Sequence, residues 1–134
     1  TGDVPCWLGR LRSTGDILVI WNQSSAEEIE RGYSRGRLSV AVSKDEVNSW
    51  QRFRTVAQSD GLEDAGEVEL APVKHVRAKE DLGVLPDDFS RYDYPRLAFV
   101  QGKVVMIYKA IEFVKGERVT EQRATVVPES WFYE

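Results

Sequence analysis

The residues that carry common enzyme chemistry are sparse in this sequence and form no familiar catalytic set. One cysteine, Cys6, excludes an intramolecular disulfide and a cysteine-rich zinc site, and we expect it to be a small buried hydrophobic residue. One histidine, His75, excludes a metal site built on two histidines and disfavours a Ser-His triad. We interpret six acidic residues as solvated loop charges because no spacing pairs them for acid–base catalysis: Glu63, Asp64, Glu67, Glu69, Asp87 and Asp88. We therefore expect no metal and no organic cofactor.

The composition is that of a globular domain and argues against two classes of partner. The 134 residues are 42% hydrophobic and 30% charged, which suits one ordinary domain or part of a larger one. The net charge of -4 disfavours binding to a nucleic-acid backbone, which needs a basic surface. Every apolar run is shorter than the ~20 residues of a membrane span. We expect neither a nucleic-acid nor a membrane partner, and the compartment is not indicated.

Short apolar segments separated by turn residues predict β-strands along most of the chain. Residues 17–22 form a near-continuous apolar run, which is typical of a strand buried on both faces. Leu38, Val40 and Val42 alternate with small residues, which is the period of a strand. Further strands are expected at residues 6–12, 50–57, 97–100, 103–110 and 119–127.

The strands group into two similar halves joined by a long loop. In each half an apolar strand meets a glycine turn, Gly15 or Gly102, and the next strand ends in an aromatic residue, Trp21 or Tyr108. We interpret residues 5–57 and 94–134 as two blade-like units of one domain, with a loop at 58–93. The polar, glycine-punctuated segment 23–37 is also expected to be a loop. The fold class is therefore all-β, with two propeller-like blades of antiparallel strands and an incomplete second blade whose missing strand residues 131–133 partly replace.

One segment carries a recognisable turn motif. From Ser43 to Trp50 the order Ser-Lys-Asp-Glu-Val-Asn-Ser-Trp follows the Asp-box pattern Ser-x-Asp-x-Gly-x-Thr-Trp. In such a turn the carboxylate of Asp45 and the hydroxyl of Ser43 accept backbone N–H bonds, and the tryptophan packs between sheets. Val47 replaces the glycine and Ser49 the threonine, so the positive φ that the glycine allows would be costly at Val47.

The motif and its surroundings resemble the sialidase (neuraminidase) family with Asp-box (BNR) repeats. Arg-Leu-Ala-Phe-Val and Lys-Val-Val-Met-Ile-Tyr in the second half, and the closing Arg-Ala-Thr-Val-Val-Pro-Glu-Ser-Trp-Phe, are similar to the last two blades of a six-bladed sialidase-like propeller. The resemblance covers nearly the whole chain. It implies that the chain corresponds to the C-terminal third of such a propeller, and that other blades complete the ring.

The resemblance also implies site residues. Sialidases clamp a substrate carboxylate with three arginines, and the third lies just before the Asp-box strand, where Arg35 fits and Arg37 is the alternative. The family's nucleophile is a tyrosine opening the first strand of the last blade, which matches Tyr94, with Tyr92 as the weaker choice for contacting substrate. The family's acid/base aspartate, its activating glutamate and its first two arginines have no counterpart here.

Two functions follow as hypotheses. The first is the C-terminal part of a sialidase-like glycoside hydrolase that acts on acidic sugars and is inactive alone. The second is a non-catalytic glycan-binding or self-assembling propeller module. Unpaired strand edges and apolar sheet faces favour a homo-oligomer, possibly a trimer of two-blade chains, or association with the remaining blades.

Overall fold

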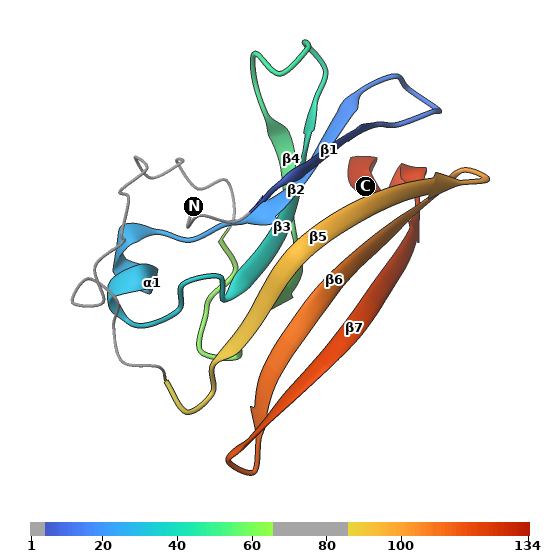
Figure 1. Ribbon diagram of the computed structural model, residues 1–134. Helices are drawn as coiled ribbons and strands as arrows, with labels where there is room; N and C mark the ends of the chain where they lie inside the picture. Colours follow the sequence, from blue (N-terminus) through green and yellow to red (C-terminus); the bar gives the residue numbers. More distant parts are fainter. Residues whose placement is uncertain (1–4, 66–85) are drawn as a thin grey trace.

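The computed structural model describes residues 5–65 and 86–134 as two antiparallel β-sheets. The first sheet contains β1 (Trp7–Arg10), β2 (Ile17–Asn22), β3 (Arg37–Ser43) and β4 (Gln51–Gln58) in that order. The second sheet contains β5 (Ser90–Val100), β6 (Lys103–Val114) and β7 (Glu117–Pro128). The all-β prediction, with blade-like antiparallel sheets of four and three strands, is confirmed (Figure 1).

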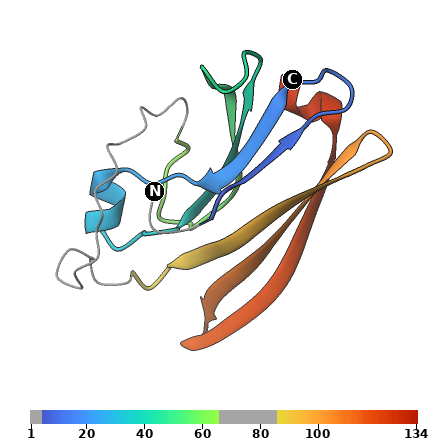
Figure 2. The same cartoon turned by 45° about the horizontal axis from the view of Figure 1, so that its top comes forward.

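The two sheets are layered, with β5 nearest the first sheet and β7 farthest from it (Figures 1 and 2). The hairpins of the second sheet turn at Gln101-Gly102 and Lys115-Gly116, where all four residues have positive φ. Such turns match the right-handed twist of the strands they join. The second sheet is therefore a regular meander of long strands, and β7 is its outer edge.

The core lies between the two sheets because each contributes alternate residues to it. From the first sheet, Leu18, Ile20 and Val40 are fully buried. Met106 and Tyr108 of β6 meet them from the second sheet. We call these the inner faces, and the opposite sides of the two sheets the outer faces. Trp7 is 43% exposed, Trp131 packs on the core, and Trp21 is buried on the opposite side of the first sheet, where it pairs with Ser39.

Several sequence predictions differ from the structure in position or type. β5 begins at Ser90, seven residues before the predicted strand at Leu97, because contacts with the first sheet order this polar stretch. Residues 26–30 form the short helix α1 (Ala26–Glu30) rather than a loop, since Ser25 and Glu28 make a capping box. Cys6 is exposed, so its predicted burial is wrong. His75 and most of the predicted loop at 58–93 lie outside the described residues.

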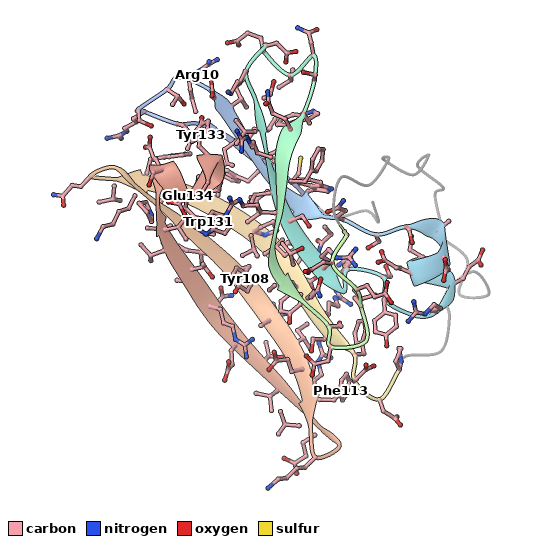
Figure 3. All side chains as sticks on the ribbon, turned by 180° about the vertical axis from the view of Figure 1, so that it is seen from behind. Arg10, Tyr108, Phe113, Trp131, Tyr133 and Glu134 are labelled. Atoms are coloured by element: carbon pink, nitrogen blue, oxygen red, sulfur yellow. The ribbon has the colours of Figure 1, made fainter. Side chains whose placement is uncertain are left out.

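The C-terminus does not supply a fourth strand to the second sheet. Residues Glu129–Tyr133 form a 3₁₀ helix, η2, which contacts β4 of the first sheet. Phe132 is fully buried in the core, and burial of this ring favours the helix over continued strand pairing. Figure 3 shows Trp131, Tyr133 and Glu134 close to the end of the first sheet that carries Arg10. Within the described part of the chain, β7 therefore has a neighbouring strand on one side only.

Candidate functional site

The segment before β3 is joined to β5 by one buried amide. Asn22, at the end of β2, donates from Nδ2 to the carbonyl oxygens of Tyr92 at 2.8 Å, Arg37 at 3.1 Å and Arg35 at 3.5 Å. The backbone N–H of Tyr92 donates to the carbonyl of Arg35 at 3.1 Å. These bonds hold two distant segments of the chain side by side. Sequence reasoning missed Asn22, although a polar residue closing a buried apolar strand was the available signal.

A buried carboxylate lies at this junction. Asp93 is fully buried in β5, and its Oδ1 accepts from Arg35 Nη1 at 3.1 Å. Its Oδ2 accepts from Arg91 Nε at 2.7 Å. A buried carboxylate is stable only when paired, and here two guanidinium groups share it. Both arginine side chains remain partly exposed, at 21% for Arg35 and 37% for Arg91. Asp93 therefore anchors positive charge at the edge of the protein surface.

Tyr94 follows Asp93 directly and occupies a bulge. Asp93 pairs with Lys109 and Arg96 with Ile107, so Tyr94 and Pro95 together oppose Tyr108 alone. Tyr94 has φ 51°, the left-handed conformation that glycine usually takes in such a bulge. The residue is 55% exposed, and its hydroxyl makes no hydrogen bond with any described residue. The bulge thus presents the tyrosine to solvent at a cost in backbone strain.

The two preferred site residues of the sequence analysis both adjoin Asp93, since Arg35 bonds to its carboxylate and Tyr94 is the next residue along β5. Arg35 also has a left-handed backbone, with φ 65°. Left-handed non-glycine residues also occur in the hairpin turns, so this backbone conformation does not by itself mark a functional site: Glu46, Val47, Gln101 and Lys115. The Arg35 side chain is 21% exposed, and Tyr94 is 55% exposed. Asp93 was missed because nothing in its sequence neighbours marks it.

Arg37 has a structural role, because all five of its N–H donors bond to other groups of the protein. Nη1 and Nη2 donate to the two carboxylate oxygens of Glu28 at 3.1 and 2.6 Å. Nε donates to Gln58 Oε1, while Nη1 and Nη2 also reach the carbonyls of Gln23 and Glu63. Burial alone would raise the pKa of Glu28, but the bonds from Arg37 and Ser25 outweigh it and lower that pKa. Arg37 therefore ties α1 to the first sheet and leaves no donor for a ligand.

Tyr92 belongs to the core. It is buried against Tyr108 with ring centroids 6.0 Å apart, and its hydroxyl donates to the carbonyl of Gln58 at 3.2 Å. Burial raises the pKa of Tyr92. The geometry gives it a role in joining the sheets rather than a surface for substrate.

The hairpin between β3 and β4 is closed by hydrogen bonds to the side chains of Ser43 and Asp45. Asp45 Oδ1 accepts from the backbone of Ser49 at 2.8 Å, and Asp45 Oδ2 from its hydroxyl at 2.6 Å. The hydroxyl of Ser43 donates to Asp45 at 2.9 Å and accepts from the backbone of Val47 at 2.9 Å. The bonds from Ser49, followed by that from Ser43, lower the pKa of Asp45. The turn therefore keeps the local network that its sequence predicts.

The substitutions in this motif have visible consequences. Val47 has φ 66°, so a β-branched residue stands in the conformation that the motif's glycine would take freely. Trp50 is half-buried and lies apart from the core cluster of the described residues. The expected packing of Trp50 between the sheets is thus not seen. This hairpin stands at the opposite end of β3 from the junction at Asp93.

Other kinds of site find no support in the described residues. Across residues 5–65 and 86–134, no group of three His, Cys, Asp or Glu residues could hold a metal ion. In the same residues no helix has the length and apolar character needed to cross a membrane. Comparison with known protein families, curated proteins and solved structures found no match to this chain.

Proposed function

We propose that this chain is the C-terminal part of a sialidase-like glycoside hydrolase that acts on acidic sugars and is inactive without further blades. One observation carries the proposal. Arg35 and Tyr94 come from distant segments and both adjoin Asp93, because Arg35 bonds to its buried carboxylate and Tyr94 is the next residue of β5. They are the residues to which the resemblance assigns the carboxylate clamp and the nucleophile.

The chemistry of the two side chains suits an acidic sugar. A guanidinium attracts a carboxylate, so Arg35, whose side chain is 21% exposed, would orient the acid group of the sugar. Tyr94 would attack the anomeric carbon and form a glycosyl–tyrosine bond as the aglycone leaves, and water would then cleave that bond. A neutral phenol suits this role because a carboxylate nucleophile would repel the acid group of the substrate.

The remainder of the site would come from outside this pair. A phenol needs a base to take its proton, and no carboxylate among the described residues bonds to the Tyr94 hydroxyl. The open edge of β7 also fits a sheet that is completed by another strand. We accordingly expect the 134-residue chain to bind an acidic sugar weakly and to leave a chromogenic sialoside uncleaved.

Nuclear magnetic resonance titration with the methyl glycoside of N-acetylneuraminic acid tests the binding step. We expect the largest chemical-shift changes at residues 35 and 91–96, with the corresponding methyl ester, which lacks the charge, binding at least about tenfold more weakly. Arg35→Ala should abolish the shifts, whereas Arg118→Ala, an exposed arginine on β7, should leave them unchanged. Equal binding of acid and ester, or binding that survives Arg35→Ala, would refute the proposed site.

A second candidate function is glycan binding without catalysis, as in the alternative hypothesis. The lack of a base beside Tyr94 in the described residues favours it. The two candidates separate in a preparation with the missing blades supplied. Turnover that Tyr94→Phe abolishes supports the hydrolase, while unchanged binding with no turnover supports the binding module.

A further inference from the structure

The outer face of the second sheet is unusually apolar for a surface in contact with water. Cross-strand register places Ala98, Val105 and Val126 in one row across β5, β6 and β7. The next row contains Ile107 of β6. Val126 is 55% exposed and Ile107 39% exposed. An antiparallel sheet with one solvated face normally carries polar residues there, so this face is suited to a partner.

The same face is positively charged. Arg96, Lys103, Lys109 and Arg118 share it by register with the apolar rows. In the described residues its one acidic side chain is Asp93, which is fully buried under its own arginines. This contrasts with the chain as a whole, whose net charge is -4. The face therefore favours a partner that is both apolar and acidic.

The outer face of the first sheet has the complementary character. Leu8 pairs with Val19 on this side, and Leu8 is 52% exposed. Phe53 packs against Trp21 on this side, with ring centroids 6.0 Å apart, and Trp21 itself is only 8% exposed. The side chain of Arg37 lies on this side of β3, so its bonds to Glu28 and to the carbonyl of Glu63 place their segments there. Their exposed acidic residues are Glu27, Glu30, Glu63 and Asp64.

We propose that the outer face of the second sheet binds the outer face of the first sheet of another copy of this chain. The apolar centres then bury each other, and the acidic rim of one copy meets the basic rows of the next. A symmetric contact between two second sheets is disfavoured because it would bring four cations of each face together. The contact is thus head-to-tail, and copies add in one direction until a ring closes. It does not depend on sugar binding.

Sedimentation and light scattering of the 134-residue chain test the association. We expect the mass to rise above the 15.3 kDa of one chain as concentration increases. Ile107→Glu breaks the second-sheet face and Leu8→Glu the first-sheet face, and each residue is already partly exposed. Each variant should raise the dissociation constant at least about tenfold, since an unpaired charge is buried. Val114→Lys, at the tip of the same hairpin as Ile107, is the matched control.

Mixing the two variants distinguishes a head-to-tail contact from any symmetric one. Ile107→Glu keeps an intact first-sheet face, and Leu8→Glu keeps an intact second-sheet face. An equimolar mixture should therefore form one-to-one dimers and nothing larger. The proposal is overturned if the unchanged chain stays monomeric at millimolar concentration, if either variant associates like the unchanged chain, or if the mixture stays monomeric. Circular dichroism and thermal unfolding confirm that each variant is folded before it is scored.

Discussion

Two buried carboxylates connect the sheets, one at each end of the molecule, and their partners differ in kind. Asp93 is held by the guanidinium groups of Arg35 and Arg91. Glu129 of η2 instead accepts from the backbone N–H groups of Arg12 and Ser13 at 3.2 and 2.7 Å, and from the hydroxyl of Ser13. Asp93 is therefore paired with two positively charged groups, whereas Glu129 accepts hydrogen bonds from neutral donors of a hairpin turn.

Each carboxylate also has a tyrosine beside it, and the two tyrosines behave differently. Tyr133 bonds to Asp16 Oδ2 at 2.6 Å and to Thr14 Oγ1 at 2.7 Å, so it closes the same hairpin as Glu129. Tyr94 is exposed, sits on a strained backbone and makes no hydrogen bond with a described residue. At the Glu129 end the polar groups bond to the β1–β2 hairpin. At the Asp93 end, Tyr94 and parts of the Arg35 and Arg91 side chains remain exposed to solvent. This difference places the candidate site at Asp93.

Of the substitutions considered, Asp93→Asn should lower the free energy of unfolding the most. The variant leaves an amide donor against one of two guanidinium groups in a buried position, and breaking a buried ion pair is costly. Because both arginines reach water in part, we expect a loss of about 2–4 kcal/mol in the free energy of unfolding. Urea denaturation measures it, with the exposed Asp87→Asn as the control. A loss below that of the Glu129 variant described next would break the comparison.

Glu129→Gln should cause the next largest loss in the free energy of unfolding. Replacing one carboxylate oxygen by an amide leaves at least one N–H or O–H of the hairpin unpaired, at about 1–3 kcal/mol. The same urea denaturation measures this loss. Sugar binding at the Asp93 end should be unchanged, since the two clusters lie at opposite ends. A change in sugar affinity would show that the ends are not independent.

The contribution of Glu129 should depend on pH in a defined direction. Burial opposes ionisation, but the bonds from Ser13 and Arg12 outweigh it and lower the pKa of Glu129. A lowered pKa in the folded state stabilises the protein above the unfolded value of ~4.3, and this stabilisation is lost as pH falls through the folded pKa. The stability difference between the unchanged chain and Glu129→Gln should therefore be full at pH 7 and shrink toward pH 3. A difference independent of pH would contradict the assignment.

The smallest effects separate the two tyrosines. Tyr133→Phe removes two hydrogen bonds and should cost about 1 kcal/mol, whereas Tyr94→Phe should cost less than about 0.5 kcal/mol. Burial and the bond to Asp16 raise the pKa of Tyr133 to about 12, so its contribution should persist below about pH 10 and vanish toward pH 12. Denaturation at pH 7 and pH 11.5 measures both. Equal losses for the two variants would remove the contrast.

The sequence predicts the strands well where burial follows from local pattern. The run at 17–22 matches β2 at both ends because every residue in it suits a strand buried on both sides. The sequence does not predict the role of a residue whose bonding partners are distant along the chain. Arg35 and Arg37 stand two residues apart in similar surroundings, and only the folded chain shows that Glu28, Gln58, Gln23 and Glu63 converge on the second. Asp93 was missed for the same reason. The capping box before α1, by contrast, was readable from Ser25 and Glu28.

Thermal unfolding in the presence of N-acetylneuraminic acid tests the central claim most directly. A ligand that binds the folded chain stabilises it by mass action, so ten times the dissociation constant should raise the midpoint by about 5 °C. We predict the same rise for the unchanged chain and for Glu129→Gln, and no rise for Arg35→Ala. A rise in Arg35→Ala, or none in the unchanged chain, would contradict the placement of an acidic-sugar site beside Asp93.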